Sequence, residues 1–136
     1  MARPGRALEA AVKHGAAGRC EYCHFPESAS ELPFHVDHII AEKHRGPTVS
    51  ANLAWACFSC NLAKGPNIAG IDPTTGRLTR LFHPRRDVWD EHFGWNGAVL
   101  RGRTAIGRTT IVVLAMNESD SIAVREALLD EGGFDR

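Results

Sequence analysis

Four cysteines occur as two closely spaced pairs, Cys20 with Cys23 and Cys57 with Cys60. Two thiolates separated by two residues can bind one zinc ion because a tight turn brings both sulfurs to the same side. Two such turns complete a tetrahedral shell with no position open for substrate, so we expect a structural Zn²⁺ site. Four buried cysteines without a metal, or a redox role for one pair, are the alternatives to this interpretation.

A second group of polar residues lies between and beside the cysteine pairs: Asp37, His38, Asn52 and, directly after Cys60, Asn61. Asp37 and Asn61 offer oxygen ligands of the kind that a hard cation such as Mg²⁺ prefers. His38 can be neutral at cellular pH and accept a proton from water. Each residue alone has a common structural explanation, but together they are typical of metal-assisted hydrolysis.

Three cations border this group: Lys43, Arg45 and Lys64. We expect them to contact phosphate, with solvated surface charges as the alternative. His35 lies two residues before Asp37 and could be an alternative metal ligand, although a structural role is the simpler interpretation.

The local sequence predicts the elements that must position these residues. Phe34 to Ile40 and Leu53 to Ala56 have the apolar and β-branched content of strands, and Ser59 could cap a short helix that ends at Gly65. A regular strand would point Asp37 and His38 to opposite faces, so we expect an irregular strand end or a bulge there.

The flanking segments predict further elements. A helix is expected from about Arg3 to His14 before the first cysteine pair. After the centre we expect a strand at 77–82, a helix at 87–93, a strand at 98–100 and helices at about 104–116 and 119–131. In the last helix an apolar stripe is expected to face the core; its members are Ile122, Val124, Ala127, Leu128 and Leu129.

Three stretches resemble the HNH endonucleases: Asp37-His38-Ile39, Asn52-Leu53, and Cys57 to Asn61 followed by Lys64-Gly65. The resemblance implies a ββα-metal (His-Me finger) core with His38 as general base, Asp37 and Asn61 holding a catalytic Mg²⁺ or Mn²⁺, and Asn52 bracing the loop that positions His38. It also implies DNA as substrate and products with 5′-phosphate and 3′-hydroxyl ends. Several later motifs resemble the C-terminal extension of a small bacterial subgroup; they include Leu81 to Arg85, Trp89, His92-Phe93 and Gly107 to Thr109.

These observations predict an α+β protein that forms a single HNH nuclease domain over residues 1–136. The ββα-metal core with its four-cysteine zinc site would cover about 17–68, preceded by an N-terminal helix and followed by a β-hairpin and helical extension over about 69–136. We expect a DNA endonuclease, with a non-catalytic zinc-ribbon-like module that binds nucleic acid or protein as the alternative. A monomer and a homodimer are both compatible with one site per chain.

Composition places the chain among ordinary globular proteins, since 43% of its 136 residues are hydrophobic and 24% are charged. No apolar stretch approaches the ~20 residues of a membrane span, and no signal-peptide core follows the basic start Met1 to Arg6, so a cytoplasmic location is expected. The formal net charge is zero. Seven arginines nevertheless lie between Arg77 and Arg108, where they could contact phosphates or form a solvated face.

Overall fold

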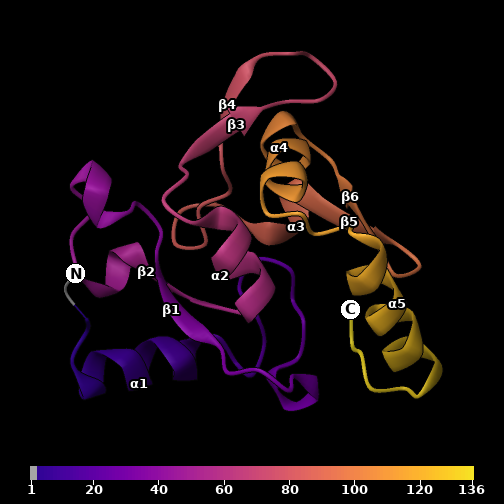
Figure 1. The fold of residues 1–136 in the computed structure, drawn as a ribbon, viewed down its shortest axis with the longest axis horizontal. Helices are drawn as coiled ribbons and strands as arrows, with labels where there is room; N and C mark the ends of the chain where they lie inside the picture. The colour runs from indigo at the N-terminus through magenta and orange to yellow at the C-terminus, as the bar shows by residue number, and fades with distance from the viewer. Residues whose placement is uncertain (1–2) are drawn as a thin grey trace.

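The computed structural model describes residues 3–136; Met1 and Ala2, part of the basic start, lie outside the described residues. It is an α+β structure of five helices and three separate two-stranded antiparallel sheets, as the sequence predicted for the fold class. Figure 1 shows the N-terminal half around β1, β2 and α2, and the C-terminal half around α3, β5, β6, α4 and α5. Within the described chain, every helix is too short or too polar to cross a lipid bilayer.

The centre of the chain forms a strand, loop, strand and helix. β1 (His35–His38) pairs antiparallel with β2 (Leu53–Ala56), and α2 (Phe58–Lys64) follows directly and packs on β1. All four residues of β2 are buried, which explains why this short strand lacks the alternation of a half-exposed one. The prediction that Ser59 caps α2 is wrong: Cys57 is the N-cap, because its sulfur accepts a hydrogen bond from Cys60 N.

The N-terminal helix α1 (Arg6–Gly15) lies against β1 and β2 (Figure 1) and buries Val12 beneath them. It begins three residues later than expected, since the backbone of Gly5 is extended. Short 3₁₀ turns at Glu27–Ala29, Glu42–His44 and Ser50–Asn52 shape the loops around the central hairpin.

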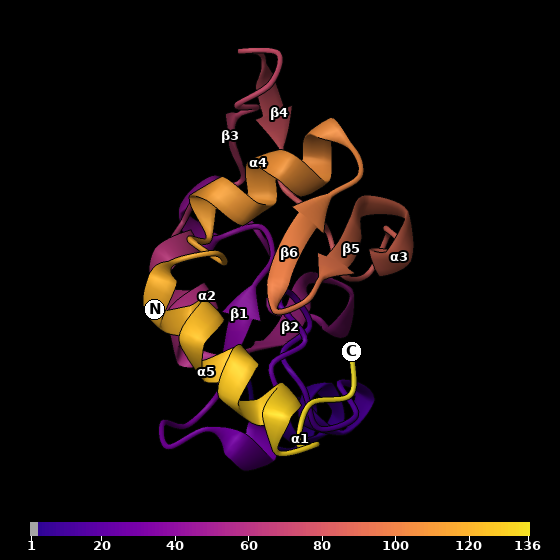
Figure 2. The same cartoon turned by 90° about the vertical axis from the view of Figure 1, so that its right-hand side faces the viewer.

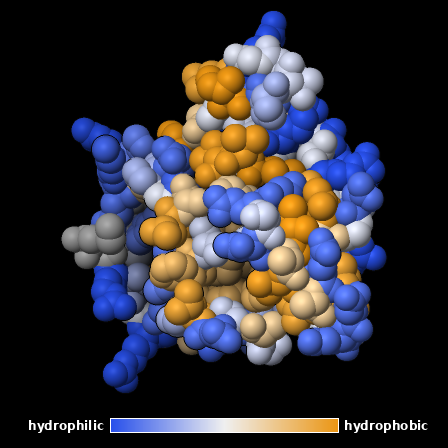
Figure 3. Space-filling model, turned by 45° about the vertical axis from the view of Figure 1, so that its right-hand side comes forward, coloured by the Kyte–Doolittle hydropathy of each residue, from blue (hydrophilic) through white to orange (hydrophobic). Residues whose placement is uncertain are grey.

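Two hairpins build most of the C-terminal half. β3 (Ala69–Ile71) pairs with β4 (Leu78–Arg80), and β5 (Phe93–Asn96) pairs with β6 (Val99–Gly102); β3 and β5 were not expected from the sequence. The β3–β4 hairpin projects from the molecule (Figures 1 and 2), and Ile71 and Leu78 are exposed on it. Figure 3 shows apolar surface below the outer end of the projecting part. α4 (Ala105–Val113) packs against β3, β4 and β6 and joins the two hairpins.

The predicted helices of this half are present but shorter at one or both ends. α3 (Trp89–His92) ends where Phe93 enters β5, and α4 ends at Val113 rather than near Met116. α5 (Ser119–Asp130) runs diagonally across the face shown in Figure 2. The apolar stripe predicted for α5 is only partly buried: Ile122, Leu128 and Leu129 are half-buried, whereas Val124 is 47% exposed and Arg125 is the fully buried residue of the helix. The Arg125 guanidinium donates to the carbonyls of Ala98 and Met116 at 2.7 and 2.9 Å, so it satisfies two turn carbonyls that lie outside the helices and strands.

Candidate functional site

The four cysteines come together as predicted. The sulfurs of Cys20, Cys23, Cys57 and Cys60 all lie within 4.8 Å of one another, and all four side chains are buried. Sulfurs of a tetrahedral zinc site with bonds of about 2.3 Å would stand about 3.8 Å apart. The separation between Cys23 and Cys57 is 3.8 Å. The cluster is therefore positioned to form a metal site whose size fits Zn²⁺.

Backbone amides already point at two of the sulfurs. Cys20 Sγ accepts from the amides of Tyr22 and Cys23 at 3.4 and 3.5 Å, and Cys57 Sγ accepts from that of Cys60. Hydrogen bonds from the neighbouring cysteine thiols, with Cys20 the strongest, lower the pKa of Cys57 far below its usual range, while hydrogen bonds to Cys20 raise the pKa of Cys23 and Cys60. The bonds that Cys57 accepts stabilise its thiolate, which is the form that binds metal.

Asn52 fixes the loop that follows β1. Its side-chain oxygen accepts from Ile40 N at 2.9 Å, and its amide nitrogen donates to the carbonyls of Ile40 and Pro47, each also at 2.9 Å. Gly46 is required where this loop closes, because a Cβ there would lie 1.6 Å from the Ile40 carbonyl oxygen. Asn52, only 5% exposed, thus ties both ends of the 40–47 loop to the start of β2.

His38 lies at the end of β1, next to this loop. Its Nε2 lies 2.9 Å from Thr48 Oγ1 and 3.8 Å from Glu42 Oε1. The Nδ1 atom accepts no hydrogen bond from any of residues 3–136. The loop therefore holds one ring nitrogen of His38 and leaves the other one for an exogenous group.

Asp37 lies deep beside the cysteine cluster. It is 5% exposed; Tyr22 donates its hydroxyl to Oδ2 at 2.6 Å, and the Lys64 ammonium lies 3.1 Å from Oδ2 and 3.2 Å from Oδ1. Burial raises the pKa of Asp37, and the Lys64 charge and the two hydrogen bonds oppose that rise. The Asp37 carboxylate is thereby held by Tyr22 of the first cysteine turn and by Lys64 of α2.

The pairing of β1 with β2 is regular through Asp37 and His38, so there is no bulge at these residues, but the strand ends at His38 and the chain bends at Ile39. The two side chains make separate contacts: Asp37 with Tyr22 and Lys64, and His38 with Thr48 and Glu42. Lys64 bridges them, because its ammonium also donates to the His38 carbonyl at 3.0 Å.

The remaining predicted site residues divide by exposure. Lys43 and Arg45 are exposed on the loop after β1, where a phosphate could reach them. Lys64, which we expected among the same phosphate contacts, is only 1% exposed and neutralises Asp37. His35 is exposed and lies against the Phe58 ring with a centroid distance of 6.3 Å. Asn61 is half-buried on α2, one turn before Lys64, and its side-chain amide bonds to none of the other described side chains.

Asp37 and Asn61 fit a hard divalent cation by their chemistry, since both offer oxygen and lie on the adjoining elements β1 and α2. Lys64 is the present counter-cation of Asp37, so a divalent cation would have to share or displace that contact.

The C-terminal extension contacts the first cysteine turn directly. Arg85 donates through both terminal guanidinium nitrogens to Glu21, at 2.6 and 2.8 Å, and the same carboxylate accepts from Trp55 N on β2. Trp89 donates its indole N–H to the Tyr22 carbonyl at 2.8 Å and stacks on His24. The extension thus supports the turn from which Tyr22 reaches Asp37.

In the comparison with known families, the family model described as HNH endonuclease matches residues 20–67. This segment is therefore similar to an HNH endonuclease domain. It contains both cysteine pairs, the β1–β2 hairpin and α2, the elements that the resemblance predicted as the core. Neither the curated proteins nor the solved structures contain a match to the chain.

Several residues that shape the HNH site were not found by the sequence analysis. Tyr22, Glu42 and Thr48 are not among the predicted site residues, because nothing in their local sequence indicates a contact with Asp37 or His38. Only the Lys64 spacing, one helical turn after Asn61, signalled that this lysine could share a face with the site.

Proposed function

We propose that the chain is a metal-dependent HNH endonuclease that hydrolyses DNA phosphodiester bonds. The observation that carries this proposal is the setting of His38, whose Nε2 is held by Thr48 and Glu42 while Nδ1 bonds to none of the described residues. A general base needs one fixed nitrogen and one free lone pair, and this arrangement provides both. The HNH match of the segment that contains His38 supports the same reaction class.

In the proposed reaction, Nδ1 of His38 removes a proton from the water that attacks phosphorus. Nε2–H then donates to Thr48 Oγ1, and the Glu42 carboxylate, 3.8 Å from Nε2, stabilises the imidazolium that forms. Asn52 keeps the His38 ring in position, because its hydrogen bonds close the 40–47 loop that follows β1. The water attacks phosphorus opposite the 3′ oxygen, which leaves as an alkoxide and takes a proton from solvent to become the 3′-hydroxyl, while the phosphate stays on the 5′ end.

A cation such as Mg²⁺ or Mn²⁺, held by Asp37 and Asn61, would neutralise the charge that builds on the phosphate and on the leaving oxygen. Lys64 holds the Asp37 carboxylate in place beside α2, and Tyr22 fixes its second oxygen. Lys43 and Arg45, exposed on the adjoining loop, are the proposed contacts to the DNA backbone.

We also infer that residues 69–136 belong to the same domain as the HNH segment. The bidentate Arg85–Glu21 pair and the Trp89–Tyr22 hydrogen bond join the two across more than 60 positions of sequence. Removing the extension would expose the cysteine turn that positions Asp37.

Cleavage of supercoiled plasmid by the zinc-loaded protein tests the proposal, with Mg²⁺, Mn²⁺ or EDTA added in parallel. Conversion to nicked or linear DNA with a divalent cation but not with EDTA supports the endonuclease. Intact plasmid in every condition, together with a gel shift of the same DNA, would instead favour a non-catalytic zinc module.

A further inference from the structure

A pocket lies beside the HNH site, between the end of β1, α2 and the turn that follows β4. Its volume is about 240 Å³, and Ile39, Ile68, Arg80, His83 and Arg86 are among the residues that line it. Lys64 lines it too, and the same lysine contacts Asp37 and the His38 carbonyl. The pocket therefore adjoins the proposed catalytic residues, yet three of its polar lining residues come from the C-terminal extension.

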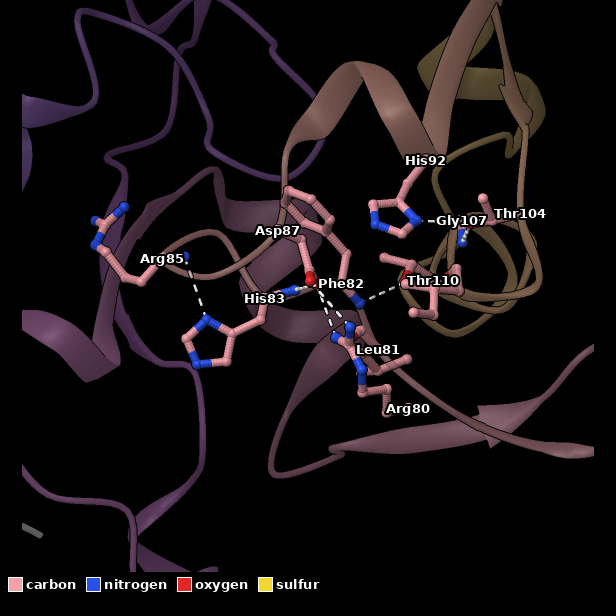
Figure 4. Close-up of polar contacts among 11 residues, drawn as sticks. Arg80, Leu81, Phe82, His83, Arg85, Asp87, His92, Thr104, Gly107 and Thr110 are labelled. Atoms are coloured by element: carbon pink, nitrogen blue, oxygen red, sulfur yellow. Dashed lines mark hydrogen bonds and ion pairs between the residues drawn. The ribbon is translucent and has the colours of Figure 1, made fainter.

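His83 presents an N–H donor that has no acceptor in the described chain. The side chain is 8% exposed, and its Nδ1 accepts a hydrogen bond from Arg85 N at 3.2 Å, so the ring proton lies on Nε2. Figure 4 shows Nε2 on the side of the ring that points away from the Leu81–Asp87 turn. None of residues 3–136 accepts from this nitrogen.

Burial, together with the nearby charge of Arg86, lowers the pKa of His83 and so favours the neutral ring. With its Nδ1 lone pair already used, a neutral imidazole can only donate through Nε2, so a ligand in the pocket would have to offer an acceptor there.

The charges around the pocket are positive. Arg80 is committed to Asp87, with guanidinium–carboxylate distances of 2.7 and 2.9 Å (Figure 4), and Lys64 is committed to Asp37. Arg86 is exposed, and none of the described carboxylates forms an ion pair with it. No acidic side chain is among the lining residues that the structure describes.

We propose that this pocket binds a backbone phosphate of the DNA, flanking the one that is cut, with His83 Nε2 and Arg86 as its donors. Phosphate oxygens supply the missing acceptor, the arginine supplies the opposite charge, and the apolar walls of Ile39 and Ile68 suit the deoxyribose. This inference rests on the proposed function. It gives the extension a role in holding the substrate strand in register with His38.

The salt dependence of DNA binding tests this pocket independently of cleavage. Binding of the zinc-loaded protein to two unrelated fluorescent 20-base-pair duplexes would be measured over a range of salt concentrations. Arg86→Ala should weaken binding to both duplexes equally and reduce the slope of log K against log salt by about 0.9, the value for one lost phosphate contact. His83→Phe keeps an aromatic ring but loses the neutral Nε2 donor, along with the Nδ1 acceptor of Arg85 N, so it should weaken binding without changing that slope.

The matched control is Arg6→Ala, which removes an exposed arginine of α1 outside the pocket. The proposal is overturned if Arg86→Ala keeps the wild-type slope, or if Arg6→Ala changes affinity and slope as much as Arg86→Ala does. Should His83→Phe fail to fold, Arg86→Ala decides alone, because this exposed side chain forms no ion pair within residues 3–136. Wild-type protein that binds but never cuts would contradict the proposed function, while the slopes would still decide the phosphate pocket.

Discussion

Lys64→Met should destabilise the protein strongly, because it removes the counter-cation of a buried carboxylate. The Lys64 and Asp37 side chains are 1% and 5% exposed, and Nζ lies 3.1 Å from Oδ2. Removing one partner of a buried ion pair costs about 3–5 kcal/mol, because the other charge remains in a medium of low polarity. Such a loss is a large part of the roughly 5–15 kcal/mol that stabilises a domain.

Urea denaturation of zinc-saturated protein, followed by circular dichroism, measures this loss as the change in unfolding free energy. For a chain of this size the melting temperature should fall by roughly 10–20 °C. Lys43→Met, at an exposed lysine of the neighbouring loop, is the matched control and should change stability by less than about 0.5 kcal/mol. The double variant Asp37→Asn/Lys64→Met should lose less than Lys64→Met alone, since no unpaired charge remains.

The destabilisation by Lys64→Met should also depend on pH. Burial raises the pKa of Asp37 in the folded protein, and loss of the Lys64 charge that opposes this rise must raise it further. A carboxyl whose pKa is higher in the folded than in the unfolded state favours folding at low pH and loses that contribution as pH rises through the folded pKa. The deficit of the variant should therefore shrink as pH falls from 7 towards that pKa. A deficit below about 1 kcal/mol at pH 7, or one independent of pH, would refute the buried ion pair.

Three further perturbations test other parts of the structure. Cys60→Ser should reduce bound zinc below one equivalent per chain and abolish the cooperative unfolding transition; full zinc content by metal analysis would contradict a four-cysteine site. Asn52→Ala should lower stability by about 1–3 kcal/mol, because the buried amide and carbonyl of Ile40 lose their partner, and unchanged amide exchange at Ile40 would refute this. The bidentate hydrogen bonds from Arg108 lower the pKa of Asp72 in the folded protein. The Asp72 carboxylate therefore stabilises the fold at pH values above its ordinary pKa of about 3.9, and this contribution is lost as pH falls through the lower folded pKa. In Arg108→Gln the Asp72 carboxyl carbon should titrate by NMR nearer the ordinary pKa, and an unchanged midpoint would contradict the pair.

The sequence predicted the elements whose signals are local. β2 was predicted with the bounds observed, because Leu53 to Ala56 is a short apolar run that stops at a cysteine. The four cysteines were predicted to meet, because their spacing fits the coordination geometry of a single ion, and their sulfurs do lie together. The role of Asn52 as a brace came from the family resemblance; its hydrogen bonds to the 40–47 loop are compatible with that role.

Features that depend on distant partners could not be predicted from local patterns. Lys64 was expected to contact phosphate, which requires an accessible ammonium, but it is buried because it pairs with Asp37 on another element. α5 was expected to bury an apolar face, but its fully buried residue is Arg125, whose guanidinium donates to the carbonyls of Ala98 and Met116 in distant turns. Ser59 was the expected cap on residue type alone, and the sulfur of Cys57 took that place within the cysteine cluster.

The most direct test of the account is the single-turnover rate of plasmid nicking by His38→Ala, with His35→Ala as its control. Both histidines lie on β1, but His35 is exposed and far from the Thr48 and Glu42 contacts that hold His38. At equal zinc content, His38→Ala should cut about 10²–10⁴-fold more slowly, the usual contribution of a general base, whereas His35→Ala should keep the wild-type rate. A zinc-loaded His38→Ala variant that cuts as fast as the wild type would contradict the central claim.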